Sequence, residues 1–245
     1  MKKREATPVT EDRIEAQPSI GAAGKRWSGH RLCLLAGLAV LLAVWLTPLP
    51  RLAGSGFAAD VLVNVAVLGL AAPLIAAALA ASPGLMARLP DSLVSPMPVA
   101  LAGFGVVWLW HIPVLHGLAG LSRGVWIAEQ ASFAVAGLLL WTTALRPASA
   151  SGREAGAGIL ALLLTATHLV LLGTLLALAP RPLYTYAIDT LGDAYAELAA
   201  QRVGGMLMLL AGFSHLAGAL YLVNRLLRQP PDAVAPRLRA TSDGR

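Results

Sequence analysis

The sequence predicts an all-α fold: a polytopic membrane helix bundle with six transmembrane helices and both termini in the cytoplasm. Two observations support this class. Hydrophobic residues make up 57% of the 245 residues and charged residues only 13%, roughly half the charged share of a typical soluble domain. The apolar residues also gather in long runs, and the 19 Lys and Arg residues lie mostly in the tails and connections between those runs.

Six apolar segments are long enough to cross a bilayer, because about 20 helical residues span its hydrocarbon core and lipid offers no partner to exposed backbone groups. They are residues 31–49, 57–82, 96–121, 125–145, 156–180 and 198–227. Turn-forming prolines mark the breaks, among them Pro48, Pro83 and Pro147. We therefore expect a six-helix transmembrane domain over 31–228, flanked by disordered cytoplasmic tails at 1–30 and 229–245.

The basic residues predict the orientation. With both tails in the cytoplasm, fifteen Lys and Arg residues fall on the cytoplasmic side and four on the other side, namely Arg51, Arg123, Arg181 and Arg202. Such an excess is typical of cytoplasmic loops. Topology therefore explains the net charge of +6, and no nucleic-acid partner is expected. The first segment could instead be a cleaved signal peptide, although its charged leader of about 30 residues is long for one.

Polar side chains interrupt the apolar runs, where each is costly. Asp60 and Asn64 are four residues apart and share a helix face. Glu129 and Gln130 lie about one turn into the fourth segment, His111 lies about 15 Å below the outer end of the third, and His168 lies near mid-membrane. Most of these groups fall in the outer half although the helices alternate in direction, which favours a polar cavity on the extracytoplasmic side.

Purely structural roles also remain open for these residues. Asp60, Glu129 and Arg202 could form interfacial ion pairs, with Arg202 snorkelling outward. His111 and His168 could be packing residues, and the hydroxyls of Thr165 and Thr167 could satisfy the His168 ring. We interpret His116 and His215 as structural or interfacial histidines. Cys33 has no CxxC partner and is expected to be inert, and Met206 and Met208 are expected to pack.

The third and sixth segments carry backbone signals. In Trp110-His111-Ile112-Pro113 the proline removes a backbone hydrogen bond, so we expect a bend about two turns from the helix end and an unbonded Leu109 carbonyl. Gly204-Gly205 and Ser214-x-x-x-Gly218 predict close helix approach. The Walker, GxGxxG and HExxH motifs are absent from the sequence, and we do not expect an enzyme.

Several short motifs occur in a characteristic order between residues 57 and 225. They are Ala71-Ala72-Pro73-Leu74, Trp110-His111-Ile112-Pro113, Gln130-Ala131-Ser132-Phe133 with Trp141, Thr165-x-x-His168, Pro182-Leu183-Tyr184-x-Tyr186 and Gln201-x-x-Gly204-Gly205. In this order they resemble the CtaG-like, multi-pass assembly proteins of caa-type cytochrome c oxidases. The resemblance implies an assembly factor in a bacterial inner membrane that helps copper reach a haem–copper oxidase from the periplasmic side.

The chain resembles a divergent member of this family. Family members usually carry an H-x-x-x-H pair where this chain has Asp60 and Asn64, and histidines where it has Trp126 and Gln130. The Asp-Gln pair of the last motif is Ala200-Gln201 here. Copper favours imidazole and thiolate ligands over amides. The resemblance therefore implies a partly degenerate copper site.

The leading interpretation is an assembly factor that acts by binding rather than by turnover. Its partners would be membrane lipids, haem–copper oxidase subunits and periplasmic copper donors. The candidate metal residues are His111 as principal ligand, His168 as a deeper second ligand or proton partner, Asp60 and Glu129 as anionic groups that attract cations, and Asn64 and Gln130 beside them. One alternative is a proton-coupled transporter with a relay of Asp60, Glu129, His168 and Arg202. Another is a scaffold that docks oxidase subunits through its Gly-rich helix faces.

Overall fold

The computed structural model describes residues 20–53, 56–80, 95–146, 152–184 and 191–228, and this part of the chain is helical without strands. Its elements are α1 (Ile20–Leu46), α2 (Leu49–Ala53), α3 (Phe57–Ala66), the π-helical turn η1 (Val67–Ala71), α4 (Ala72–Ala80), α6 (Pro96–Trp110), α7 (Pro113–Leu121), α8 (Arg123–Ala144), α9 (Gly152–Leu178) and α10 (Leu191–Leu227). The prediction of an all-α helix bundle is confirmed.

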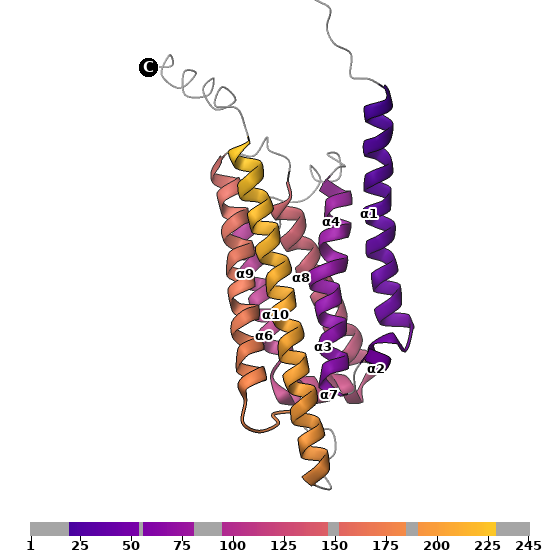
Figure 1. Ribbon diagram of the computed structural model, residues 1–245, viewed down its shortest axis with the longest axis vertical. Coiled ribbons are helices and arrows are strands. Elements are labelled where there is room, and N and C mark those ends of the chain that lie inside the picture. The colour runs from indigo at the N-terminus through magenta and orange to yellow at the C-terminus, as the bar shows by residue number, and fades with distance from the viewer. Residues whose placement is uncertain (1–19, 54–55, 81–94, 147–151, 185–190, 229–245) are drawn as a thin grey trace, which may run out of the picture.

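The long helices run side by side in one bundle, with α1 at its edge (Figure 1). Only 6% of the apolar stretch of α1 is buried. The start of α1 and the end of α10 lie at the same end of the bundle, whereas α2 and α7 lie at the opposite end, called the α7 end below (Figure 1). This arrangement is the one that an even number of crossings requires; which face of the membrane each end meets stays a prediction.

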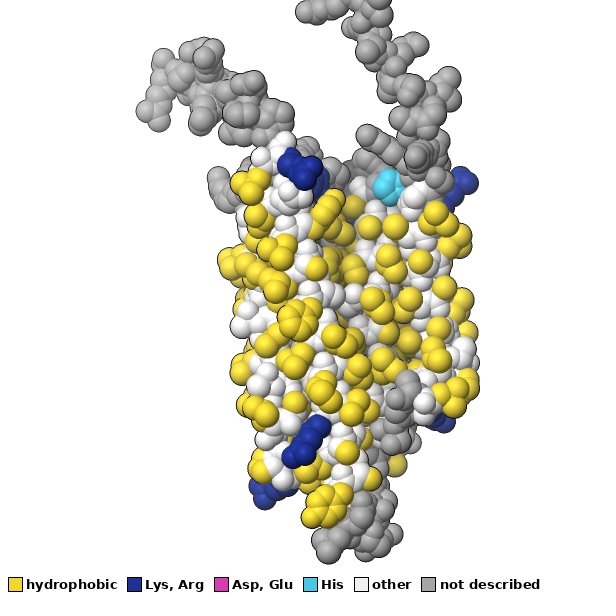
Figure 2. Space-filling view, viewed as in Figure 1, with side chains coloured by type: hydrophobic (Ala, Val, Ile, Leu, Met, Phe, Trp, Pro, Cys, Tyr) yellow, Lys and Arg dark blue, Asp and Glu magenta, His cyan; other side chains and the backbone are white. Residues whose placement is uncertain are grey.

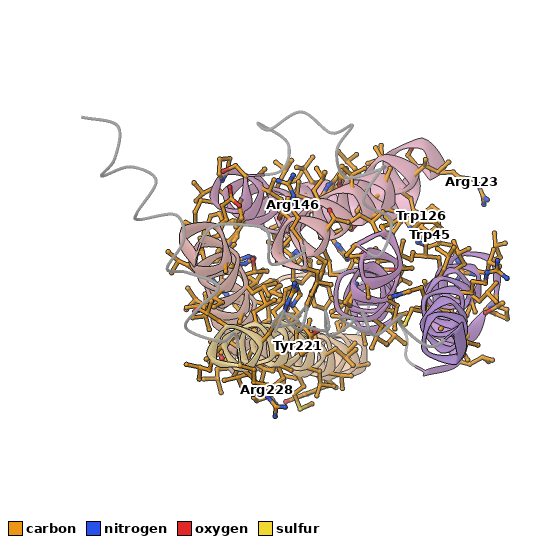
Figure 3. All side chains as sticks on the ribbon, turned by 90° about the horizontal axis from the view of Figure 1, so that it is seen from above. Trp45, Arg123, Trp126, Arg146, Tyr221 and Arg228 are labelled. Atoms are coloured by element: carbon orange, nitrogen blue, oxygen red, sulfur yellow. The ribbon has the colours of Figure 1, made fainter. Side chains whose placement is uncertain are left out.

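The number of spans agrees with the sequence. Among the described residues, five stretches are long and apolar enough to cross a membrane, and the bent pair α6 and α7 makes a sixth if it is taken as one span. Leucines, valines and other apolar side chains are exposed along the flanks, as Figure 2 shows on one side of the bundle. The labelled Arg123 and Arg228 point away from the helices (Figure 3). A surface of this kind suits lipid, so the chain is a multi-pass membrane protein.

The first helix begins earlier than predicted. The apolar stretch of α1 begins at Gly29, close to the predicted start at residue 31, but the helix itself already begins at Ile20, within the predicted tail at 1–30. Of the predicted tails at 1–30 and 229–245, residues 1–19 and 229–245 lie outside the described residues, as does the predicted turn at Pro83.

The third span is not one continuous helix, which corrects the prediction for residues 96–121. Helix α6 ends at Trp110, and α7 starts at Pro113 with its axis turned by 73°. Pro113 has no N–H, and Ile112 before it is extended, with φ −69° and ψ 124°. The predicted position of the bend is confirmed. The expectation of an unbonded Leu109 carbonyl is wrong, because it accepts a hydrogen bond from the Ile112 N–H at 3.1 Å.

A second proline explains the π-helical turn. Pro73 follows η1 and cannot donate a backbone hydrogen bond, so the regular ladder is interrupted there. The Leu68 carbonyl within η1 accepts a hydrogen bond from the Trp141 indole N–H at 3.2 Å. This contact ties the middle of the second span to α8. Two motif residues, Pro73 at the π-helical turn and Trp141 in the contact, therefore have structural roles.

Glycines bring α9 and α10 into backbone contact. A Cβ atom placed on Gly205 would lie 2.6 Å from the Gly173 carbonyl oxygen and 2.7 Å from the Ala177 nitrogen. The same atom on Gly218 would lie 2.5 Å from the Trp141 ring. The predicted close approach at both motifs is therefore confirmed.

Gly205→Ala should consequently destabilise the bundle. The new methyl group meets backbone atoms of α9 that cannot rotate away, so we expect a loss of about 2 to 3 kcal/mol in the free energy of unfolding. Unfolding of the purified protein in detergent measures it. Gly105→Ala is the matched control, because Gly105 is exposed with nothing within 4 Å of its added Cβ. Equal stability of the two variants would contradict this account.

Candidate functional site

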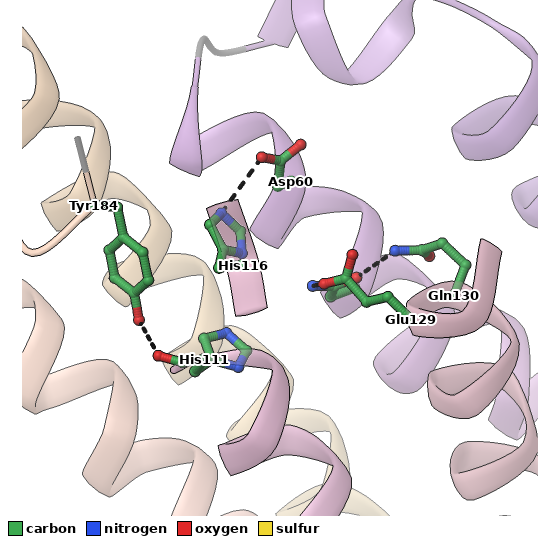
Figure 4. Close-up of polar contacts among 7 residues, drawn as sticks. Asp60, His111, His116, Glu129, Gln130 and Tyr184 are labelled. Atoms are coloured by element: carbon green, nitrogen blue, oxygen red, sulfur yellow. Dashed lines mark hydrogen bonds and ion pairs between the residues drawn. The ribbon is translucent and has the colours of Figure 1, made fainter. Parts of the chain in front are cut away.

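Polar side chains from three helices and two connections meet at the α7 end. Asp60 and Asn64 come from α3, His111 follows α6, His116 belongs to α7, and Glu129 and Gln130 belong to α8. Tyr184, from the connection after α9, closes the group on one side (Figure 4). Five of the six candidate metal residues therefore lie together, and we call this group the α7-end site.

One half of the α7-end site is a chain of hydrogen bonds. The Asn64 amide donates to Glu129 Oε1 at 3.3 Å and accepts from Gln130 Nε2 at 2.8 Å. The Trp45 indole in turn donates to Gln130 Oε1 at 3.1 Å. Asn64, Glu129 and Gln130 are all buried. Because both amide oxygens already accept hydrogen bonds, Asn64 and Gln130 serve to hold Glu129 and to tie the loosely packed α1 to α3 and α8.

The other half is built on His116 and Asp60. His116 Nε2 lies 3.5 Å from Asp60 Oδ2, with the imidazole buried and the carboxylate side chain 41% exposed. The His116 ring packs edge-on against both Phe57 and Tyr184, with centroid distances of 5.1 and 5.0 Å. Asp60 thus connects the surface of the bundle to a buried histidine, and Glu129 lies within electrostatic range of both.

Sequence reasoning missed this role of His116. In a continuous helix, residues five apart lie about 140° apart around the axis, so His111 and His116 would face different neighbours. The 73° bend at Pro113 changes their directions, and the two imidazoles lie within electrostatic range of each other. The only available signal was Pro113 itself, which marks the bend without giving its angle.

His111 has one ring nitrogen satisfied and one without a partner. Its Nδ1 lies 2.7 Å from the Val107 carbonyl oxygen, and since a carbonyl only accepts, Nδ1 carries the proton. The lone pair is then on Nε2, which is buried and has no hydrogen-bond partner among the described residues. Buried polar atoms are normally satisfied. This nitrogen therefore marks a position at which a ligand can be held.

Tyr184 fixes the backbone at the bend. Its hydroxyl donates to the His111 carbonyl oxygen at 2.7 Å, and its ring stacks on Phe57 at 4.0 Å. Burial raises the pKa of the Tyr184 phenol, so the hydroxyl stays protonated and continues to donate. Gln201 anchors the same connection, because it accepts from the Leu183 N–H at 2.6 Å and donates to the Leu176 carbonyl at 3.2 Å. The sequence identified Tyr184 and Gln201 as motif residues but did not predict these hydrogen bonds.

Tyr184→Phe should therefore loosen the bend. The substitution leaves the buried His111 carbonyl without its donor, which costs about 1 to 3 kcal/mol. The free energy of unfolding in detergent measures the effect. Tyr195→Phe is the control, since Tyr195 is 75% exposed. Identical losses in the two variants would show that the hydroxyl does not hold the bend.

His168 does not join the α7-end site. It lies on α9, packs against Phe104 with a centroid distance of 5.0 Å, and has His215 as its electrostatic neighbour. Arg202 is exposed, as the snorkelling interpretation expects. The relay of the transporter alternative is thus not assembled around Asp60 and Glu129. Within the described ranges, no three His, Cys, Asp or Glu residues are grouped to hold a metal ion.

Comparison with known protein families decides the broader assignment. The family model of the cytochrome c oxidase caa3 assembly factor matches residues 16–229, which include every described helix. The chain belongs to this family. Comparisons with curated proteins and with solved structures give no match. Membership confirms the resemblance carried by the ordered motifs, and it supports a role in oxidase assembly for this multi-pass protein.

Proposed function

We propose that this family member is an integral membrane assembly factor of a haem–copper cytochrome c oxidase and that it holds copper, its cargo, at the α7-end site. The observation that carries the proposal is the buried His111 Nε2, which has no hydrogen-bond partner among the described residues, on an imidazole within electrostatic range of the carboxylate-paired His116. A buried imidazole nitrogen without a hydrogen-bond partner supports a metal-binding role for His111 better than a role in packing.

The chemistry of the two histidines fits copper. Imidazole nitrogen is a suitable copper ligand. Metal-binding histidines also tend to donate their second N–H to a backbone carbonyl or a carboxylate, which fixes the ring. His111 has Val107 in the first role, and His116 has Asp60 in the second. Both rings are thus oriented before any ion arrives.

The carboxylates supply charge rather than further ligands. Asp60 is the exposed member and draws cations toward the buried rings. Glu129 is held inside by Asn64 and lies within electrostatic range of His116. The amides of Asn64 and Gln130 position Glu129. In this proposal His116 takes the place that the sequence gave to His168, and the site is smaller than the one that the resemblance implies.

The α7 end faces the periplasm in this proposal. The sequence predicts fifteen Lys and Arg residues for the cytoplasmic side and four for this side, and this bias supports the orientation, in a bacterial inner membrane. Copper would then arrive from periplasmic donors and leave to oxidase subunits, with lipids around the flanks. The protein works by binding and transfer, without turnover of a substrate.

A deletion strain of the native host tests the function. We expect oxidase activity in its membranes to fall and to recover in part when copper is added to the medium, because excess copper relieves a delivery defect. The wild-type chain supplied in trans should restore full activity at ordinary copper. Unchanged oxidase activity in the deletion strain at limiting copper would contradict the proposal.

A further inference from the structure

A second pair of histidines lies away from the α7-end site. His168 is on α9 and His215 is on α10, and both are buried, with 3% and 0% of their surface exposed. The two imidazoles are close enough for their charges to interact. Helices α9 and α10 are in close contact here, because a Cβ atom on Gly212 would lie 3.2 Å from the Ala166 carbonyl oxygen.

Three of the four ring nitrogens in this pair are unsatisfied. His215 Nδ1 lies 2.8 Å from the Ala211 carbonyl oxygen, which places the proton on Nδ1 and the lone pair on Nε2. His215 Nε2 and both nitrogens of His168 have no hydrogen-bond partner among the described residues. The hydroxyls of Thr165 and Thr167, next to His168, donate instead to the Ala161 and Leu163 carbonyls.

The surroundings of the pair favour a soft monovalent cation. No third His, Cys, Asp or Glu joins the two rings in the described part of the chain, so a divalent ion would lack both charge and ligands. Aromatic rings lie beside both imidazoles: Phe104 at 5.0 Å from His168 and Trp141 at 5.1 Å from His215. Aromatic faces attract cations. Cu(I) is monovalent and accepts two imidazole ligands in a linear arrangement.

We propose that His168 and His215 form a second binding site, inside the bundle, which takes one Cu(I) ion between their imidazoles. The bond from His215 to Ala211 orients its ring in the way that metal-binding histidines are oriented. The position of the site rests on the unsatisfied nitrogens, whereas the choice of copper rests on the proposed function. The protein then holds one ion at the α7-end site and one deeper in the bundle.

Anaerobic Cu(I) titration of the purified full-length protein in detergent, in competition with bicinchoninate, tests this site. We expect two bound ions for wild type and one each for His215→Asn, His168→Asn and His111→Ala. His30→Asn is the control, since His30 is exposed on α1, and it should keep two. X-ray absorption of singly loaded His111→Ala should show copper with two imidazole nitrogens, which gives a readout even if an inner variant fails to fold.

The outcomes separate the two claims. One ion that is lost in His111→Ala but kept in His215→Asn and His168→Asn would overturn the inner site and leave the proposed function standing. One ion that is kept in His111→Ala but lost in His215→Asn and His168→Asn would support the inner site and refute copper at the α7-end site. No bound Cu(I) in wild type would overturn both.

Discussion

Asn64→Leu is expected to destabilise the protein by about 3 kcal/mol, which is among the largest losses available at a single position. The substitution removes the donor to Glu129 Oε1 and the acceptor for Gln130 Nε2 together. Each buried polar group left without its partner costs about 1 to 3 kcal/mol. Unfolding of the purified variant in detergent measures the difference from wild type.

Matched variants distinguish the loss of these hydrogen bonds from a general destabilisation by any Asn→Leu substitution. Asn224→Leu replaces an exposed asparagine near the end of α10 and should leave stability within about 0.5 kcal/mol of wild type. Adding Glu129→Leu and Gln130→Leu to Asn64→Leu should recover part of the loss, because the two buried groups left without partners are removed and only the half-buried Trp45 indole N–H loses its acceptor. A triple variant less stable than Asn64→Leu would contradict this explanation.

His111→Ala is expected to weaken Cu(I) binding at the α7-end site by on the order of 100-fold, since it removes a ligand nitrogen. Asp60→Asn should weaken it less, about 10-fold or more, because Asp60 acts through the orientation and charge of His116. Competition titrations on the purified proteins give both ratios. The graded order distinguishes a ligand from a group that positions one.

Controls for these two variants exist in the same chain. Glu154→Gln removes an exposed carboxylate from α9 and should leave Cu(I) affinity unchanged. If Asp60→Asn weakened binding no more than Glu154→Gln does, Asp60 would have no specific part. If His111→Ala kept the wild-type affinity at both sites, copper binding at the α7 end would be refuted.

Much of the fold could be predicted because lipid makes strict demands on sequence. Each crossing needs a long apolar run, and six such runs were visible; the structure contains them, with the third divided. Proline and glycine act locally, so the bend at Pro113 and the close contact at Gly205 were also visible. The motif order identified the family, although single motifs such as Ala71-Ala72-Pro73-Leu74 are common.

The site was less predictable because it depends on which helices are neighbours. Periodicity placed Asp60 and Asn64 on one helix face. It could not show that Asp60 faces His116 while Asn64 faces Glu129. The angle at Pro113 brings His116 into the site, and no sequence rule gives that angle. His168 pairs with His215 for the same reason: the register of α9 against α10 decides it, and that register is set by packing over both helices.

The most direct measurement is the copper content of the oxidase itself. The enzyme is purified from deletion strains that carry wild type, His111→Ala, His116→Ala or His30→Ala in trans, and its copper-to-haem ratio is determined at equal levels of the assembly factor. The account predicts a full ratio with wild type and His30→Ala, and a clearly lower ratio with His111→Ala and His116→Ala. A full copper-to-haem ratio in all four strains would contradict it.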